Sequence, residues 1–271
     1  MKVRNIFFVL LMIFVVLVIS IPTLLGAFGT IPPEHLRSIA KQYLFLSYNP
    51  YNKSLWSASP EVVAAIVWDY RGLDTLYETM VFYTAIIGAL MLYSEILGSK
   101  DVIGGKGLSF IVKRGTAIVL LAILAVGIST VLHGMITPGG GFQGGAIMAV
   151  APIVALIVFS RTFLDKSKLT YAHFISIRSL ALLGVILAPL IPLISNAFIF
   201  QNQAKSLPIF QSPIFFTYPS TIIDVPMGGL IAILNIFEGI AVFSAFALAF
   251  MILLYSEELS RKPLEGEDIG Y

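Results

Sequence analysis

The chain has no cysteine and few charged residues. Of its 271 residues, 12% are Asp, Glu, Lys or Arg, while 58% are hydrophobic and the mean hydropathy is +0.92. The absence of cysteine excludes disulfides, thiolate metal sites and iron–sulfur clusters within this chain. A formal net charge of +2 gives no reason to expect nucleic acid as a partner. The low polarity indicates a membrane protein rather than a soluble globular one.

Long apolar stretches recur along the chain, and their lengths suit a membrane. About 20 residues are needed for a helix to cross roughly 30 Å of hydrocarbon. Six stretches approach this length, so we predict an all-α, polytopic membrane protein with spans at approximately 6–28, 74–97, 115–136, 145–160, 171–195 and 227–255. The first follows basic residues, as a secretory signal does, but its apolar core exceeds the roughly 7–15 residues of such a signal. We therefore interpret it as an anchor.

Lysine and arginine are unevenly divided between the predicted loops, which indicates how the chain is oriented. With the N-terminus inside, the inner segments hold eleven basic residues and the outer segments four. The inner ones are Lys2, Arg4, Lys100, Lys106, Lys113, Arg114, Arg161, Lys166, Lys168, Arg261 and Lys262, and the outer ones are Arg37, Lys41, Lys53 and Lys205. Because cytoplasmic loops carry the excess of Lys and Arg, we predict a cell-membrane protein with both termini in the cytoplasm. The loops near 29–60 and 196–226 then face outward.

A glycine-rich run separates the third and fourth predicted spans. Residues 138–145 read Pro-Gly-Gly-Gly-Phe-Gln-Gly-Gly, with five glycines in eight residues. Such a run is incompatible with a helix interior, so we predict an outward-facing turn formed by Pro138, Gly139, Gly140, Gly141, Gly144 and Gly145. The run lacks the Gly-Lys-Ser/Thr of a phosphate-binding loop. Its small residues instead let the flanking helices pack closely.

The residues around this run resemble a known family. The segment 133–145, which begins His-Gly-Met-Ile-Thr and continues through the glycine-rich run, is similar to the signature of the B subunit of Mrp-type multisubunit Na⁺/H⁺ antiporters. In that signature a histidine at a helix end precedes the same turn. Met135 stands where the family's pattern usually has a second histidine. His133 is then either a hydrogen-bonded tether for the turn or a group that handles ions or protons.

A second segment, residues 60–78, resembles the C-terminal part of the large A subunit of the same antiporters. Residues 69–78 read Asp-Tyr-Arg-Gly-Leu-Asp-Thr-Leu-Tyr-Glu and follow the family's pattern, although Tyr77 replaces the usual glycine. The segment also exists as a small separate subunit in archaeal membrane-bound hydrogenases. We therefore predict a fusion, with an A-subunit-like domain at 1–112, a B-subunit-like domain at 113–271 and a join within the linker-like stretch 98–112.

Both resemblances imply the same setting. They favour a non-catalytic subunit of an Mrp-type antiporter module within a respiratory complex related to membrane-bound hydrogenase or to its sulfane-reducing relative. The implied partners are other antiporter subunits, a peripheral redox arm and membrane lipid. No cofactor or resident metal is expected in this chain, so iron–sulfur clusters and any metal site would belong to partner subunits, and Na⁺ would bind only transiently.

Charged residues around the start of the second span are candidates for ion handling. Asp69 precedes the span. A helix that continues through residue 72 would place Arg71, Asp74 and Glu78 on one face. These residues form either an ion-paired staple at the outer interface or a protonatable, cation-attracting site at the edge of the membrane.

Glu238 lies about eleven residues into the last predicted span, which corresponds to a depth of roughly 16 Å. An ionised carboxylate at that depth costs on the order of 3 kcal/mol, so it must be protonated, paired or hydrated. Asn235 is one turn away on the same face, and Arg178 on the preceding span is a candidate partner. Glu238 is then either a polar tie between helices or a participant in proton or Na⁺ movement.

Three classes of function compete. The sequence favours an ion-translocating subunit that lends polar residues to a Na⁺ or H⁺ route. The alternative is a purely structural subunit that braces a larger antiporter module. An intramembrane enzyme lacks support, because the sequence contains no HExxH zinc motif, paired catalytic aspartates or GxS nucleophile.

Overall fold

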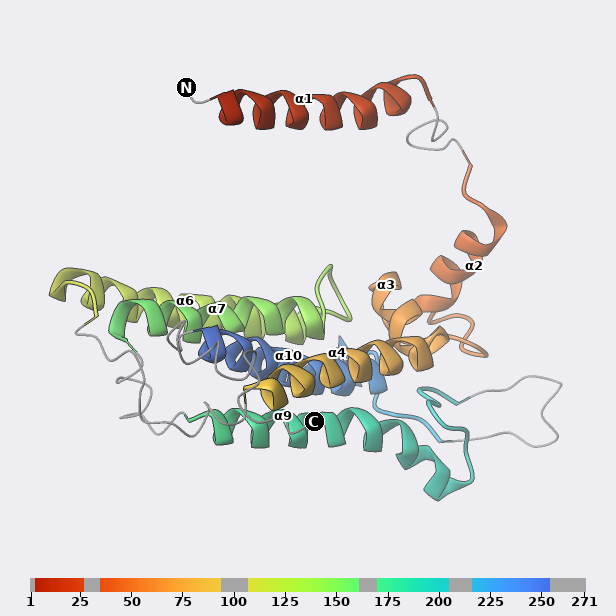
Figure 1. Ribbon diagram of the computed structural model, residues 1–271. Helices are drawn as coiled ribbons and strands as arrows, with labels where there is room; N and C mark the ends of the chain where they lie inside the picture. The colour runs from red at the N-terminus through yellow and green to blue at the C-terminus, as the bar shows by residue number, and fades with distance from the viewer. Residues whose placement is uncertain (1–2, 27–34, 94–106, 161–169, 205–215, 254–271) are drawn as a thin grey trace, which may run out of the picture. The chain divides into compact units, whose positions relative to one another are not determined.

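The computed structural model describes residues 3–26, 35–93, 107–160, 170–204 and 216–253, and these are mostly helical (Figure 1). Six helices are long and apolar enough to cross a membrane: Ile6–Leu24, Gly72–Leu92, Phe110–His133, Gly141–Phe159, Tyr171–Ser195 and Leu230–Ile252. The predicted all-α, polytopic architecture with six spans is therefore confirmed.

The chain divides into two compact units, Met1–Gln42 and Tyr43–Tyr271. The first unit contains α1 (Val3–Leu24), in which residues 6–19 are all exposed. A helix that is apolar on every side suits a hydrocarbon surrounding. The short helix α2 (Ser38–Ser47) crosses the boundary between the units.

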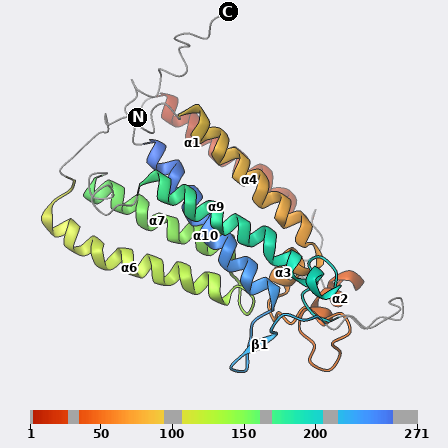
Figure 2. The same ribbon diagram turned by 90° about the horizontal axis from the view of Figure 1, so that it is seen from below.

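The second unit is a helical bundle built around α10 (Leu230–Leu253). α6 (Phe110–His133) packs on α7 (Gly141–Phe159), α7 packs on α10, and α10 packs on α9 (Tyr171–Leu187). α4 (Gly72–Leu92) and α6 lie on opposite sides of α10 (Figure 2). The span of α10 is 67% buried, whereas those of α4 and α6 are each 11% buried. α10 is therefore the core of the bundle, and α4 and α6 are its margins.

A short helical segment leads into α4. α3 (Val62–Ala65) continues as the π-helix η1 (Ile66–Tyr70), in which the Arg71 N–H donates to the Ile66 carbonyl at 2.8 Å. The Glu61 side chain caps α3 by accepting from the Ala64 N–H. Residues 62–70 are thus helical without being a span. The new helix starts at Gly72, where an added Cβ would lie 2.7 Å from the Phe200 ring.

The glycine-rich run is shorter as a turn than predicted. α7 begins at Gly141, so the predicted start of this span at residue 145 and the assignment of Gly141, Gly144 and Gly145 to the turn were wrong. Glycine inside a helix costs about 1 kcal/mol relative to alanine, but here it permits close packing on two sides. A Cβ on Gly144 would lie 2.6 Å from the Gly127 carbonyl oxygen of α6, and one on Gly145 would lie 2.5 Å from the Gly239 carbonyl oxygen of α10.

What remains of the turn is Pro138, Gly139 and Gly140. Gly140 has a φ of 141°, a backbone conformation that residues with a side chain rarely adopt. Its N–H donates to the Thr130 carbonyl at 3.3 Å, so the turn folds back onto the end of α6. This geometry fixes the direction in which α7 enters the bundle.

Polar contacts join the segments that precede α3 and α10. α9 continues as the 3-10 helix η2 (Ala188–Ser195), and a two-stranded hairpin of β1 (Thr221–Ile222) and β2 (Val225–Pro226) precedes α10. The fully buried Asn202 donates to the Ser57 carbonyl at 2.8 Å and accepts from the Leu230 N–H at 2.9 Å. The first of these contacts bridges 145 residues of sequence, and the two together tie the segment before α3 to the start of α10.

Parts of several predictions lie outside the described residues. These are residues 98–106 of the predicted join, residues 29–34 and 205–215 of the two outer loops, and the ends of the predicted spans at 27–28, 94–97 and 254–255.

Candidate functional site

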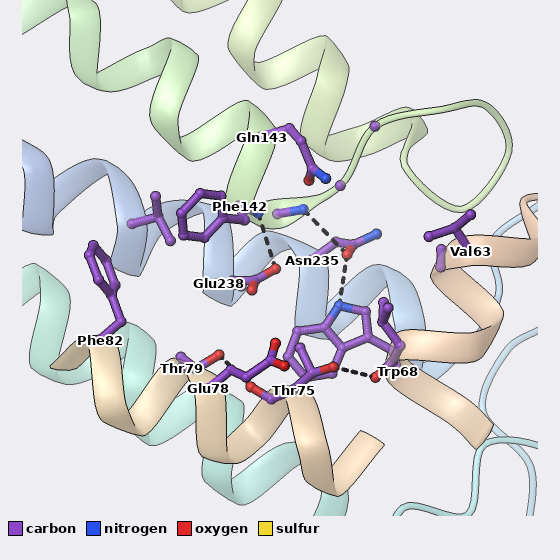
Figure 3. A pocket seen from close by; sticks show the side chains of 16 residues that line it. Val63, Trp68, Thr75, Glu78, Thr79, Phe82, Phe142, Gln143, Asn235 and Glu238 are labelled. Atoms are coloured by element: carbon purple, nitrogen blue, oxygen red, sulfur yellow. Dashed lines mark hydrogen bonds between the residues drawn. The ribbon is translucent and has the colours of Figure 1, made fainter. Parts of the chain in front are cut away.

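A cavity of about 240 Å³ lies between η1, α4, the turn before α7, and α10 (Figure 3). Its polar lining comes from four separate stretches of sequence and comprises Trp68, Thr75, Glu78, Thr79, Gln143, Asn235 and Glu238. Gly139, Gly140 and Gly141 bring main chain to the same wall. The volume is sufficient for several water molecules, and the lining offers the two or more polar partners that each would need.

Glu238 enters the cavity from α10 and is only 7% exposed. Its Oε2 accepts a hydrogen bond of 3.1 Å from the Phe142 N–H in the first turn of α7. The first N–H groups of a helix have no partner within the helix, and the helix dipole favours negative charge there. The carboxyl group is therefore buried where the fold provides a fixed donor.

Asn235 lies one turn before Glu238 and is 1% exposed. Its Oδ1 accepts from the Trp68 Nε1–H at 3.0 Å and from the Gly141 N–H at 3.4 Å. Its Nδ2 is buried without a hydrogen-bond partner in the described part of the chain. One amide oxygen thus joins η1, the start of α7 and α10 at the wall of the cavity.

Glu78 lies opposite, on α4, and is exposed. Figure 3 shows its side chain and that of Glu238 extending into the same space from different helices. The neighbouring hydroxyls are directed at main chain: Thr75 Oγ1 donates to the Val67 carbonyl at 2.6 Å, and Thr79 Oγ1 donates to the Thr75 carbonyl at 2.8 Å. Two carboxyl groups in one cavity that is large enough for water can exchange protons or attract a cation.

Comparison with known proteins places the chain in a family. Residues 111–248 match the family described as a domain related to the MnhB subunit of Na⁺/H⁺ antiporter. The chain belongs to this family. An uncharacterized protein of Methanocaldococcus jannaschii is 28% identical over 229 residues, which cover 77% of this chain and 82% of the relative.

Two solved structures resemble the chain. One is the membrane-bound sulfane sulfur reductase, an archaeal respiratory membrane complex, a chain of which has a TM-score of 0.64 and 25% identity over 92% of this chain and 98% of its own length. The other is the Mrp complex from Dietzia sp. DQ12-45-1b, with a TM-score of 0.55 and 19% identity over 95% of this chain but 26% of that chain, which shows a shared fold. The MnhB-related chain is thus a multi-pass membrane subunit of the kind found in multisubunit complexes.

Within this MnhB-related chain, the predicted site residues fall into separate groups. Glu78 and Glu238 share the cavity. Arg71 and Asp74 form an ion pair with each other at the start of α4, where their side chains are 66% and 51% exposed. Asp69 and His133 do not line the cavity, and the His133 Nδ1 lies 2.9 Å from the Ser129 carbonyl oxygen of its own helix.

The expected pairing of Arg178 with Glu238 was wrong. Arg178 is buried, but it donates to the Phe82 carbonyl at 3.3 Å and lies 4.7 Å from the centre of the Tyr83 ring. It therefore faces the middle of α4, whereas Glu238 contacts the start of α7. α10 begins at Leu230, so Glu238 is eight residues from the helix start, or roughly 12 Å, rather than the roughly 16 Å expected.

Sequence reasoning did not identify Trp68, Thr75, Thr79 or Gln143 as part of the site. Asn235 was identifiable because it lies one helical turn from Glu238. No comparable spacing links Trp68 to α10, since its contact with Asn235 joins residues 167 positions apart. The A-subunit-like segment 60–78 was the only available signal; it contains Trp68, but the pattern that carries the resemblance begins at residue 69.

Two buried phenols outside the spans predict how stability depends on pH. Burial raises the pKa of Tyr70 above its usual value of 10.0, and the adjacent Asp69 charge raises it further. Burial also raises the pKa of Tyr218, whose hydroxyl donates to the Ala188 carbonyl at 2.6 Å. A raised folded-state pKa means that the stabilisation is complete below the unfolded pKa and is lost as pH rises through the folded value.

We therefore expect the unfolding temperature of the complex to fall as pH rises above about 10. Tyr70→Phe should flatten this dependence with little cost at pH 7, because the Tyr70 hydroxyl has no hydrogen-bond partner in the described residues. Tyr218→Phe should also flatten it but cost about 1 kcal/mol at pH 7, because a hydrogen bond is lost. Thermal unfolding measured from pH 7 to 11 tests both expectations. If the unfolding temperature of the double variant fell above pH 10 as steeply as that of the unmodified complex, the assignment to these two tyrosines would be contradicted.

Proposed function

We propose that this chain is a non-catalytic subunit of an Mrp-type cation/proton antiporter module and that its cavity takes part in Na⁺ or H⁺ translocation. The observation that carries the proposal is the convergence of Glu78 and Glu238 on one cavity from separate helices. Carboxyl groups inside a membrane are costly, and in transport proteins they line ion and proton pathways. The MnhB family match supports the antiporter setting.

The similarity to a chain of sulfane sulfur reductase supports a place in a respiratory complex, with a redox arm carried by other subunits. We further propose that 1–112 is an A-subunit-like domain and 113–271 a B-subunit-like domain; a family match that starts at residue 111 is compatible with this division. Both termini are placed in the cytoplasm on the basis of the charge distribution. Cofactors, including iron–sulfur clusters, are assigned to partner subunits.

A bracing subunit is the second candidate, and one observation favours it. The hydrogen bond from the Phe142 N–H to Glu238 ties α7 to α10, as a purely structural carboxyl group would. A brace and a conduit differ in one measurable respect. Loss of a brace impairs assembly, whereas loss of a conduit impairs flux while assembly persists.

Glu238→Gln and Glu78→Gln distinguish the two functions. Glutamine keeps a carbonyl acceptor for the Phe142 N–H but cannot release a proton, so the complex should assemble normally. Na⁺-dependent or proton-dependent flux in vesicles containing the whole complex should fall by roughly tenfold or more, as expected when a proton-transfer group is lost. The redox half-reaction with artificial acceptors should be unchanged.

Asp224→Asn is the matched control. It makes the same carboxyl-to-amide change in the exposed turn between β1 and β2, and asparagine tolerates the φ of 62° found there. Its flux should equal that of the unmodified complex. Wild-type flux in both cavity variants would reject the conduit and leave the bracing role.

A further inference from the structure

A groove runs along the exposed face of α4, on the side away from the bundle core. It is lined by Arg71, Asp74, Tyr77, Glu78, Val81 and Ala85, and its volume is about 730 Å³. Tyr77 is 67% exposed and Val81 is 70% exposed. Most of α4 is exposed in the same way, since its span is only 11% buried.

Glu78 makes this groove unsuitable as a lipid-facing surface. It lies six residues from the start of α4, which puts it roughly 9 Å into the span. Within the described residues it forms no ion pair, because Arg71 is engaged with Asp74. An exposed carboxylate at this depth requires a partner, since acyl chains offer neither a hydrogen bond nor a counter-charge.

We propose that the α4 groove receives a transmembrane helix of a neighbouring subunit and that this helix carries a basic side chain opposite Glu78. The inference rests on the proposed function in one respect, that the chain works inside a multisubunit membrane complex. Charge complementarity selects the partner. Arg71 and Asp74 neutralise each other, so Glu78 contributes the net negative charge of the groove.

Other occupants from the same sequence do not meet this requirement. The span Ile6–Leu24 of α1 contains no basic residue, and its polar side chains are limited to Ser20 and Thr23. The Thr23 hydroxyl already donates to the Ile19 carbonyl at 2.8 Å. A second copy of the chain related by a two-fold axis along the membrane normal would place one Glu78 opposite another, and like charges would repel.

The position of Glu78 gives this contact a functional meaning. Glu78 and Phe82 line both the groove and the inner cavity, so they separate the partner helix from Glu238. A basic side chain at the groove would hold Glu78 in its charged form. If the basic side chain moved away from Glu78, the charge at the edge of the cavity would change. The position of the partner helix would in this way be coupled to the site.

Photo-crosslinking in the intact complex tests the occupant. Tyr77→p-benzoylphenylalanine keeps an aromatic ring at an exposed groove position. We expect a cross-link to a transmembrane segment of another subunit that contains Lys or Arg within about one helical turn of the attachment point. The same substitution at Ile118, which is 73% exposed on α6, should label a different target. A cross-link from Tyr77 to lipid alone, to a second copy, or to a segment without a basic residue would overturn the proposal.

Charge reversal tests the chemistry of the contact. Glu78→Lys should release the cross-linked subunit from the purified complex. Changing the basic residue of that subunit to Glu should then restore assembly. Glu78→Gln alone should keep the complex together. If the second reversal did not restore assembly, the proposal of a basic partner side chain would be overturned. Flux separates this inference from the proposed function. Wild-type flux in both Glu238→Gln and Glu78→Gln, together with an intact Tyr77 cross-link, would reject the conduit and retain the contact.

Discussion

Replacing Gly145 with alanine is expected to prevent stable assembly of the bundle. The added Cβ would lie 2.5 Å from the Gly239 carbonyl oxygen and 2.9 Å from the Val242 Cβ, both in α10. The nearer atom belongs to the main chain, so it cannot move away by changing a rotamer. We expect a loss of about 3 kcal/mol, at the upper end for overpacked sites. The yield of the complex in size-exclusion chromatography and its unfolding temperature measure the effect.

Gly115→Ala supplies the matched control for this prediction. Gly115 also lies inside a helix, α6, but a Cβ added there would meet nothing within 4 Å. Both substitutions remove the conformational freedom of glycine and improve helix propensity by about 1 kcal/mol. Only contact with α10 distinguishes them. Equal stability of the two variants would show that α7 does not approach α10 as closely as the structure indicates.

Replacing Trp68 with alanine is expected to be at least as damaging. Trp68 is 1% exposed and packs in a core cluster with Met135, Leu230 and Leu234. Truncating a buried aromatic side chain costs about 3–5 kcal/mol. The change also removes a wall of the cavity and the donor to Asn235, so ion flux should fall together with stability.

Trp68→Phe separates the hydrogen bond from the packing. Phenylalanine retains an aromatic ring but cannot donate to Asn235, which still accepts from the Gly141 N–H. We expect a smaller loss, about 1–2 kcal/mol. Tyr51→Ala, at a side chain that is 98% exposed, should leave the unfolding temperature unchanged. If Trp68→Ala proves as mild as Tyr51→Ala, the indole does not support the cavity.

The spans were predictable because crossing a membrane is a requirement on length and polarity that each segment meets alone. The start of α7 was not, because glycine propensity argues against a helix at 141–145 and only packing against α6 and α10 reverses it. The helix propensity of glycine and the contacts of α7 therefore disagree at this point. A single sequence shows the propensity but not the contacts.

The site was predictable in part for a related reason. Glu78 and Glu238 were identifiable one at a time, because a carboxyl group in an apolar segment is costly wherever that segment packs. Their meeting in one cavity depends on how α4 and α10 face each other, which apolar runs do not specify. The mistaken pairing of Arg178 with Glu238 has the same origin, since the rotation of α9 about its axis decides which helix the guanidinium reaches.

The π-helix η1 makes the length of this segment as important as its composition. Its wider turn contains one more residue than an α-helical turn would need, and α4 begins two residues after it ends. Removing one residue from 66–70 would allow an ordinary α-helical turn and rotate α4 about its axis by about 100°. Trp68 would then point away from Asn235, or Glu78 away from the cavity. An insertion or deletion here would therefore require a compensating change of length before α4.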